Sequence, residues 1–330
     1  MNDQIRLLTV SIDTECDHQP NWYRSSPLTF ENITSGIPDC LQPLFSDAGA
    51  VPTYLLAVEV MENVESVAML KSIENESLEF GTHLHAAFIE PDKKFHDYAG
   101  VDSPDFQCNC SPQVEFQKLE NITNLFIEKF GYAPRSFRAG RYGAGPNTLT
   151  SLEKLDYHVD SSVTPGFKWR EPNGFVDYRR APLQLYTPQA DDIGRADTPG
   201  TRAILEVPVS MRPRFGRSPK WLRPWLSDAD TMKGVVRHHL NQYANQQIVV
   251  LNMMFHSMEV IPKASPYPQS AADVMKFTEQ LKQTLDWCSN QGFLFSTLKG
   301  VREHFFEVHS LNRRGRSTFS SCAQRVPGGV

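Results

Sequence analysis

The sequence lacks several features that would assign it to a class at once. No window of the 330 residues approaches the roughly 18 consecutive apolar residues of a membrane span, so no transmembrane segment is expected. Residues 1–4 show neither a basic start nor a long apolar run, and no secretion signal is predicted. The six cysteines have no framework spacing and predict no disulfide scaffold. Together these absences predict a cytoplasmic protein.

The chain also lacks a strong charge of either sign. It has 33 Lys and Arg against 38 Asp and Glu, a formal net charge of -5, and a pI near 6.1. Such a balance gives no general affinity for nucleic acid, and no nucleic-acid partner is predicted. No internal repeat is visible, and the length fits one barrel-sized domain or two smaller ones. The oligomeric state is left open.

What the sequence does contain is an alternation of short apolar runs with amphipathic segments. Strands are expected at 8–12, 51–58, 78–82, 136–139, 158–162, 203–209, 248–255 and 293–295. Helices are expected at 36–48, 62–73, 112–130, after 146 and at 271–290. The alternation predicts an α/β fold with a mostly parallel sheet covered by helices, and we expect a barrel.

Three regions interrupt this alternation. The stretches 86–111 and 164–199 are long and rich in Pro, Asp and Gly, and they are expected to be lids or substrate loops. Residues 311–330 are basic and polar and predict a disordered tail. The expected organisation is therefore one barrel domain over 1–310 followed by that tail.

Two pairs of metal-ligating residue types stand at strand ends. Asp13 and Glu15 close the first apolar run, and His83 and His85 close the third. Residues i and i+2 of an extended chain point to the same side, so each pair shares a face. Two desolvated carboxylates need a cation or a proton between them. Carboxylate and imidazole are ligands of hydrolytic divalent metals, so the sequence predicts a metal hydrolase.

Other polar residues follow the same rule of placement. Arg138, Asp160 and His256 each lie at or just past the end of an apolar run. In parallel α/β sheets the chemistry gathers at the carboxyl ends of the strands. The same placement at the ends of five strands is stronger evidence for a functional site than any single residue. Hydrogen-bonded core histidines and helix-capping acids would also explain parts of this pattern.

Five ordered segments carry a resemblance to a known family. They are SIDTE (11–15), EFGTHLH (79–85), FRAGRYG (137–143), YHVDSSV (157–163) and MFHSME (254–259). In this order they resemble the motifs of the NodB-type polysaccharide deacetylases, carbohydrate esterases built on a deformed (β/α) barrel. Within that family the chain is most similar to proteins encoded with bacterial O-antigen and other surface-polysaccharide genes. Two departures stand out, because Thr14 separates the acids and one residue, not three, separates the histidines.

The resemblance implies a metal site and a base. Glu15, His83 and His85 would hold a divalent metal, with zinc expected first and cobalt, nickel or manganese as alternatives. Asp13 would be the general base, and Arg138 would keep it ionised and oriented. Asp13 and Glu15 are alternatives for each other's role.

The remaining implied roles concern the leaving group and the substrate. A backbone N–H near Tyr142 would stabilise the tetrahedral oxyanion. His256 would donate a proton to the departing sugar amine, and Asp160 would orient it and keep it protonated. Arg141 and Trp221 are assigned to substrate binding.

A run of alternating cations and aromatics occupies residues 212–225 (RPRFGRSPKWLRPW). A solvated loop, a surface for stacking on sugar rings, a clamp for a nucleotide or lipid pyrophosphate, and contact with an anionic membrane surface all fit its composition. Our hypothesis is that it binds the carrier portion of an activated sugar.

The sequence thus predicts a metal-dependent deacetylase acting on an N-acetylated sugar in bacterial O-antigen or lipopolysaccharide assembly. The substrate is an acetylated sugar or glycan, whether free, nucleotide-linked, lipid-linked or polymeric. The first rival is a degenerate barrel that binds metal or glycan without turnover. The second is a different amide or ester hydrolase on the same barrel, since a fold does not set a substrate.

Overall fold

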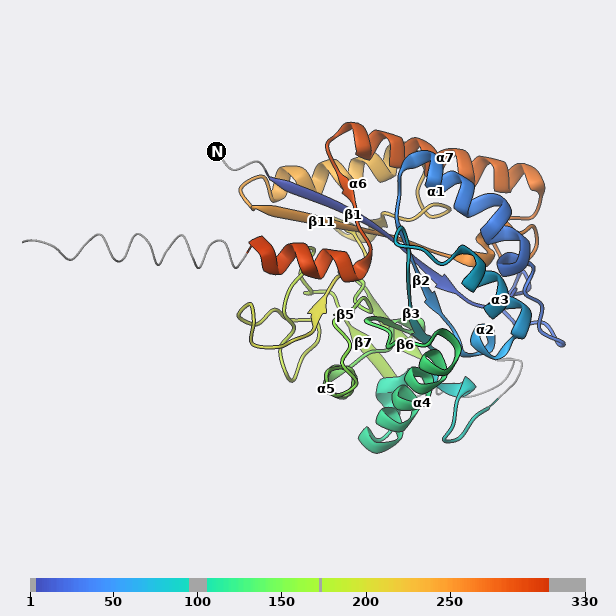
Figure 1. The fold of residues 1–330 in the computed structure, drawn as a ribbon. Coiled ribbons are helices and arrows are strands. Elements are labelled where there is room, and N and C mark those ends of the chain that lie inside the picture. Colours follow the sequence, from blue (N-terminus) through green and yellow to red (C-terminus); the bar gives the residue numbers. More distant parts are fainter. Residues whose placement is uncertain (1–3, 95–105, 172–173, 309–330) are drawn as a thin grey trace, which may run out of the picture.

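A curled parallel sheet wrapped by helices forms the centre of the protein in a computed structural model (Figure 1), which describes residues 4–94, 106–171 and 174–308. The strand order is β11-β1-β2-β3-β4-β5-β8, with short β12 (Leu294–Phe295) beside β1. These strands are β1 (Ile5–Thr14), β2 (Pro52–Leu56), β3 (Glu79–Leu84), β4 (Ser136–Ala139), β5 (Val159–Asp160), β8 (Leu205–Glu206) and β11 (Ile248–His256). All their pairings are parallel, and the predicted deformed α/β barrel is confirmed.

Strand β1 is the longest strand of the sheet, with ten residues, and its apolar run is explained by burial on both faces. Its residues Leu7, Leu8, Val10 and Ile12 are fully or almost fully buried. Parallel strands covered on both faces read as continuous rather than alternating apolar runs. The register with β11 places Asp13 opposite His256. The first predicted site residues therefore meet at one end of the sheet.

The sheet curls round on itself, but strand pairing does not close it into a complete barrel. Across the gap between β8 and β11, the Ser210 N–H donates to the Asn252 carbonyl (3.0 Å) and the Met254 N–H donates to the Leu222 carbonyl (3.4 Å). The Asn252 side chain also donates to the Val207 carbonyl at 3.1 Å. Loop backbone and one amide side chain thus complete the ring where strand pairing ends, which is the deformation of this barrel.

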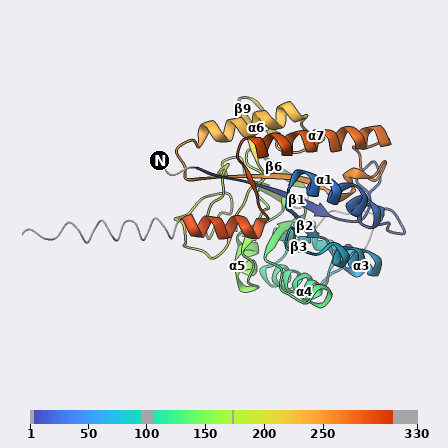
Figure 2. The same cartoon turned by 45° about the horizontal axis from the view of Figure 1, so that its top comes forward.

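Helices cover the outside of the sheet, and Figure 2 shows α6 and α7 on one side of it and α4 on the other. They are η1 (Asn32–Leu41), α1 (Gln42–Ala48), α2 (Val58–Glu62), α3 (Val64–Ile73), α4 (Pro112–Phe130), α5 (Pro146–Lys154), α6 (Ala229–Gln242) and α7 (Ala271–Asn290). α4 illustrates how they are delimited: Ser111 caps its first turn, and Gly131 (φ 83°) ends it. Within the described ranges, no helix has the length and apolarity of a membrane span.

The structure adds elements that the periodicity did not predict. Two small hairpins, β6 (Lys168–Glu171) with β7 (Gly174–Asp177) and β9 (Met211–Arg214) with β10 (Arg217–Trp221), lie in regions expected to be irregular. Helix α6 and a helix over 298–308 are also additional. The predicted tail, 311–330, lies outside the described residues, as do 95–105 of the first predicted loop.

Candidate metal centre

Three predicted ligands meet at the carboxyl end of the sheet. One ligand atom from each of Glu15, His83 and His85 lies within 4.8 Å of the other two, and all three residues are buried. His83 Nε2 lies 3.1 Å from His85 Nε2 and 3.5 Å from Glu15 Oε1. Ligand atoms held about 2.0–2.1 Å from a tetrahedral ion lie roughly 3.3 Å apart, so the spacing fits a cation.

Hydrogen bonding to His83 supports the same interpretation. Its Nδ1 lies 3.0 Å from the Arg138 carbonyl oxygen, which can only accept, so Nδ1 carries the proton. Nε2 of His83 therefore faces Glu15 Oε1 and His85. A favourable contact there needs either a proton on Nε2 or a metal cation between the groups. A carbonyl that fixes the tautomer of a histidine is also a common support of metal ligands.

Asp13 lies beside this cluster and is held by a buried arginine. Arg138 Nη1 donates to Asp13 Oδ1 at 2.6 Å, and Arg138 is fully buried. Its Nη2 also donates to Ser11 (2.5 Å) and to Ser161 (2.9 Å). Burial opposes ionisation of Asp13, but Arg138 and the nearby imidazoles bring the pKa of its carboxyl below the usual range. Asp13 is therefore a carboxylate at neutral pH.

The second oxygen of Glu15 has partners that sequence reasoning missed. Arg24 Nη2 donates to Glu15 Oε2 at 2.7 Å, and His18 Nε2 lies 3.4 Å from the same oxygen. Burial opposes ionisation of Glu15, yet the surrounding histidines, with His85 first, hold the pKa of this carboxyl well below its usual value. The 17–27 loop carries no periodic signal, so its approach to Glu15 was not predictable.

The partner of His256 is Glu259 of η5 (Ser257–Val260). His256 Nδ1 lies 2.9 Å from Glu259 Oε1, and buried Arg223 Nη2 donates to that oxygen at 2.5 Å. His256 Nε2 lies 3.9 Å from Asp13 Oδ2, so this imidazole faces the centre. Trp22, in the left-handed region (φ 67°), packs against it with ring centroids 5.1 Å apart. The spacing of three residues between His256 and Glu259 was the available signal for this pair.

The prediction that Asp160 orients His256 is wrong. The Asp160 carboxylate accepts a hydrogen bond from Ser162 at 2.6 Å and pairs with Glu206. Both acids are fully buried, and burial followed by mutual repulsion raises the pKa of Glu206 well above its usual value. The raised pKa of both carboxyl groups favours a protonated acid at this place, because burial and mutual repulsion disfavour two neighbouring negative charges.

The turn after β4 presses against the centre. Gly140 lies so close to His85 that an added Cβ would be 2.8 Å from its ring Cγ and Nδ1, so only glycine permits this contact. Arg141 and Tyr142 follow in the left-handed region (φ 51° and 60°). Arg141 is exposed, whereas the Tyr142 hydroxyl donates to Met254 Sδ at 3.4 Å. The oxyanion role of the Tyr142 backbone stays a prediction.

Trp221, predicted to bind substrate, belongs to a packed aromatic cluster. It is 7% exposed, and its ring centroid lies 4.9 Å from that of Phe167 and 6.2 Å from that of Tyr142. Arg223 lies over its ring at 6.0 Å. Trp221 therefore supports the wall beside His256 rather than offering an open stacking face, and its role in binding stays a prediction.

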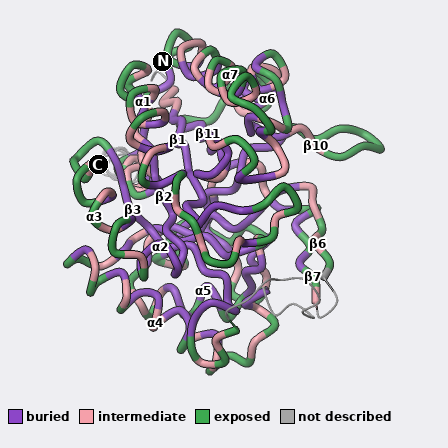
Figure 3. Tube along the Cα trace, turned by 90° about the vertical axis from the view of Figure 1, so that its right-hand side faces the viewer, coloured by how far each residue is buried: buried purple, intermediate pink, exposed green. Residues whose placement is uncertain are grey.

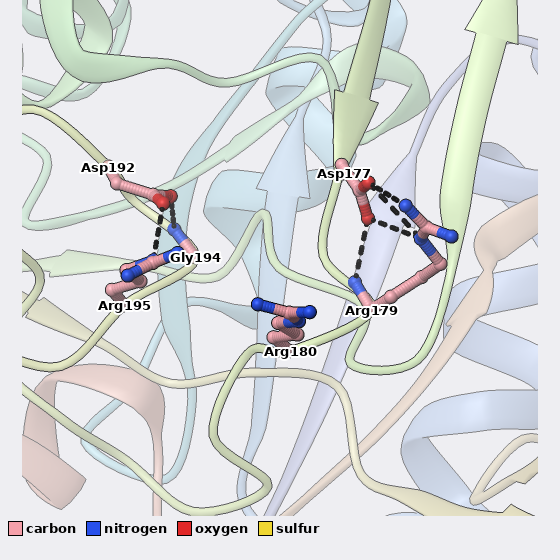
Figure 4. Close-up of a pocket in the computed structure, with 6 residues that line it drawn as sticks. All are labelled: Asp177, Arg179, Arg180, Asp192, Gly194 and Arg195. Atoms are coloured by element: carbon pink, nitrogen blue, oxygen red, sulfur yellow. Dashed lines mark hydrogen bonds and ion pairs between the residues drawn. The ribbon is translucent and has the colours of Figure 1, made fainter.

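A polar cavity that is lined by none of the residues of this centre has a different character (Figure 4). Arg179 Nη2 binds Asp177 Oδ2 at 2.5 Å, and Arg195 Nε lies 3.0 Å from Asp192 Oδ2. These four side chains project from the β7 end and the following loop, and each pair is made by residues two or three apart in sequence. Such pairs fix a loop conformation and present no set of convergent catalytic groups.

Neither a protein-family model nor a curated protein matches this sequence. Solved structures match the fold. A chain described as a glycoside hydrolase/deacetylase from Parabacteroides distasonis has a TM-score of 0.60 at 10% identity, over 91% of this chain and 71% of that chain. A chain described as a polysaccharide deacetylase from Pseudomonas aeruginosa PAO1 has a TM-score of 0.56 at 11% identity, over 92% of both chains. An allantoinase has a TM-score of 0.53 at 12% identity, over 92% of this chain and 91% of that one. At these identities the likeness establishes the fold alone.

Proposed function

We propose that the protein is a metal-dependent hydrolase that removes the acetyl group from an N-acetylated sugar. The observation that carries the proposal is the placement of Glu15, His83 and His85 within 4.8 Å of one another, next to a carboxylate held by a buried arginine. Two imidazoles and one carboxylate form the protein ligand set of several catalytic zinc sites. The fold likeness to chains described as deacetylases is consistent with this chemistry.

The chain's own groups have separate tasks in this proposal. A divalent cation held by Glu15 Oε1 and the two imidazoles would supply Lewis acidity toward the amide carbonyl and toward water. Asp13 takes a proton from the attacking water through Oδ2, the oxygen that faces His83 (4.0 Å) and His256 (3.9 Å), while Oδ1 stays bound to Arg138. His256 gives a proton to the departing amine, with Glu259 as its positioning residue.

The finer assignments belong to the same proposal. We propose that zinc is the physiological ion, that the reaction belongs to the assembly of a surface polysaccharide such as O-antigen, and that the protein acts in the cytoplasm. The five motif segments, which resemble those of deacetylases encoded with such genes, support these assignments.

Acetate release from purified full-length protein tests the proposal. The protein is loaded with zinc, cobalt or manganese and given free, nucleotide-linked, lipid-linked and polymeric N-acetylated sugars. We expect acetate, and we expect Asp13→Asn to reduce its rate about 10²- to 10⁴-fold while the bound metal is retained. His85→Ala should lose the metal as well as the activity. Exposed Asp177→Asn is the matched control and should change neither.

The same assay separates the rivals. Metal binding without acetate from any sugar would favour the degenerate barrel, for which the direct Arg24–Glu15 hydrogen bond is the supporting observation. Hydrolysis of allantoin or of a simple ester in place of the sugars would assign another amide or ester hydrolase, as the allantoinase with the same fold illustrates. Either result would replace the proposed substrate.

A further inference from the structure

The hairpin of β9 and β10 extends away from the body of the protein, as Figure 3 shows for the exposed ribbon labelled β10. Its two strands pair with each other and form a two-stranded sheet separate from the main sheet. At its tip, Phe215 is fully exposed (106%), and Gly216 makes the turn with φ 63°. Met211 and Trp221 anchor the base of the hairpin in a hydrophobic cluster. The tip has no core, and a two-stranded ribbon is marginally stable by itself, so folding does not explain the sequence of the tip.

The cations of this hairpin face one another across the two strands. The register sets Arg217 directly opposite Arg214 and Lys220 directly opposite Arg212. Like charges in direct cross-strand pairs are destabilising. Among the described residues, these four cations make no ion pair, and Arg214 only donates to the Ser218 carbonyl at 2.8 Å. An external anionic partner would remove the repulsion.

Phe215 narrows the chemistry of that partner. A soluble phosphate would pair with the arginines but leave the aromatic ring at the tip exposed, and a neutral glycan chain could stack on the ring but would leave the four cations unpaired. The interface of a bilayer takes both, because its headgroups attract cations and its acyl boundary accepts the ring. Exposed Val64 and Met275 are aliphatic and offer a comparison within the same chain.

We propose that the β9–β10 hairpin binds the surface of an anionic lipid bilayer, with Phe215 inserted at the interface and Arg212, Arg214, Arg217 and Lys220 on the headgroups. The hairpin ends at Trp221, two residues before Arg223, which contacts the His256–Glu259 pair. Bilayer attachment would hold the carboxyl end of the sheet, where Glu15, His83 and His85 lie, close to the membrane. It does not depend on the proposed hydrolysis.

Vesicle co-sedimentation of the full-length protein tests the hairpin. Vesicles of phosphatidylglycerol mixed equally with phosphatidylcholine are compared with vesicles of phosphatidylcholine alone. We expect binding to the anionic vesicles that weakens with salt. Phe215→Asp should weaken it by at least about tenfold, and Arg214→Gln with Arg217→Gln by roughly 30-fold. Met275→Asp is the control for Phe215→Asp, and Lys71→Gln with Lys276→Gln is the control for the double arginine variant. Neither control should reduce binding.

We expect these variants to keep the fold, because every substituted side chain is exposed. Unchanged thermal unfolding establishes this for each variant. Equal binding of the protein and Phe215→Asp to anionic vesicles would overturn the proposal, as would no binding to them. Binding of soluble polyphosphate that needs the arginines but not Phe215, without vesicle binding, would identify a soluble anion as the ligand instead.

Discussion

The two ends of the central sheet both bury acidic side chains, and they use them differently. At the carboxyl end, Asp13 and Glu15 face Arg138, Arg24 and imidazoles. At the amino end, Glu79 opens β3 and accepts hydrogen bonds from Ser136 (2.6 Å), Thr53 (3.1 Å) and the Lys299 N–H (2.9 Å). The last bond holds the first turn of the 298–308 helix against the sheet.

The ionisation of these acids differs in direction. Burial opposes ionisation at both ends, but cationic partners lower the pKa of Asp13 and Glu15, whereas at Glu79 burial outweighs its hydrogen bonds and the charge of Lys299 and raises the pKa. The comparison teaches that burial alone does not identify a functional acid. The partners decide whether a buried carboxyl is a charged reactant or a neutral structural cap.

Removing the cation from the carboxyl end should have the largest effect on folding. Arg138→Met leaves the buried Asp13 carboxylate unpaired, and we expect a loss of about 3–5 kcal/mol in the free energy of unfolding, measured by urea denaturation. Adding Asp13→Asn to this variant should restore part of the stability, because the uncompensated charge is gone. Equal destabilisation of the single and double variants would contradict the charge pairing.

Crowding the carboxyl end without changing its charge should have an intermediate effect. Gly140→Ala forces the His85 ring away from a Cβ that would lie 2.8 Å from it, and we expect metal affinity to fall about 10- to 100-fold. Metal titration with a competing chelator measures this. Gly234→Ala in α6 is the matched control, since its Cβ would meet only the end of the Arg212 side chain at 3.3 Å. Unchanged affinity of Gly140→Ala would show that the His85 contact is not needed.

Neutralising the amino end should have the smallest effect and no effect on hydrolysis. Because the pKa of Glu79 is raised by burial, the folded protein loses stability as pH rises through that value, starting above the ordinary 4.5. Glu79→Gln lacks this loss, so its stability relative to the parent should increase from about pH 4 to 7. Thermal unfolding across that range measures the difference, and a pH-independent difference would remove the proposed contrast.

The carboxyl-end acids predict the opposite slope. The pKa values of Asp13 and Glu15 are lowered, so their contribution to stability is present above the ordinary values and is lost as pH falls below them. The Asp13→Asn variant should therefore lose less stability than the parent in acid. This measurement on the same unfolding curves checks the sign at the other end of the sheet.

Much of the fold and part of the centre were predictable from local pattern. The apolar runs gave β1, β3 and β11, and the spacing of two residues put Asp13 with Glu15 and His83 with His85 on shared faces. The hairpins were not predicted, because exposed ribbons lack a clear period. Helix α6 was also missed, although Met232, Val235, Val236 and His239 recur at helical spacing and are buried. The role given to Asp160 was wrong, since strand-end position says nothing about which neighbour a side chain reaches.

The sequence by itself determined which strands carry carboxylates and imidazoles to their ends, because the two-residue period and the parallel arrangement are local consequences of the chain. Only the tertiary structure decided the partners. Arg24 reaches Glu15 from a loop, Glu259 rather than Asp160 reaches His256, and Arg223 is buried beside them while Arg214 and Arg217 of the hairpin stay exposed. Such pairings depend on how distant segments pack together, and desolvation then makes the choice of partner decide the charge of each group.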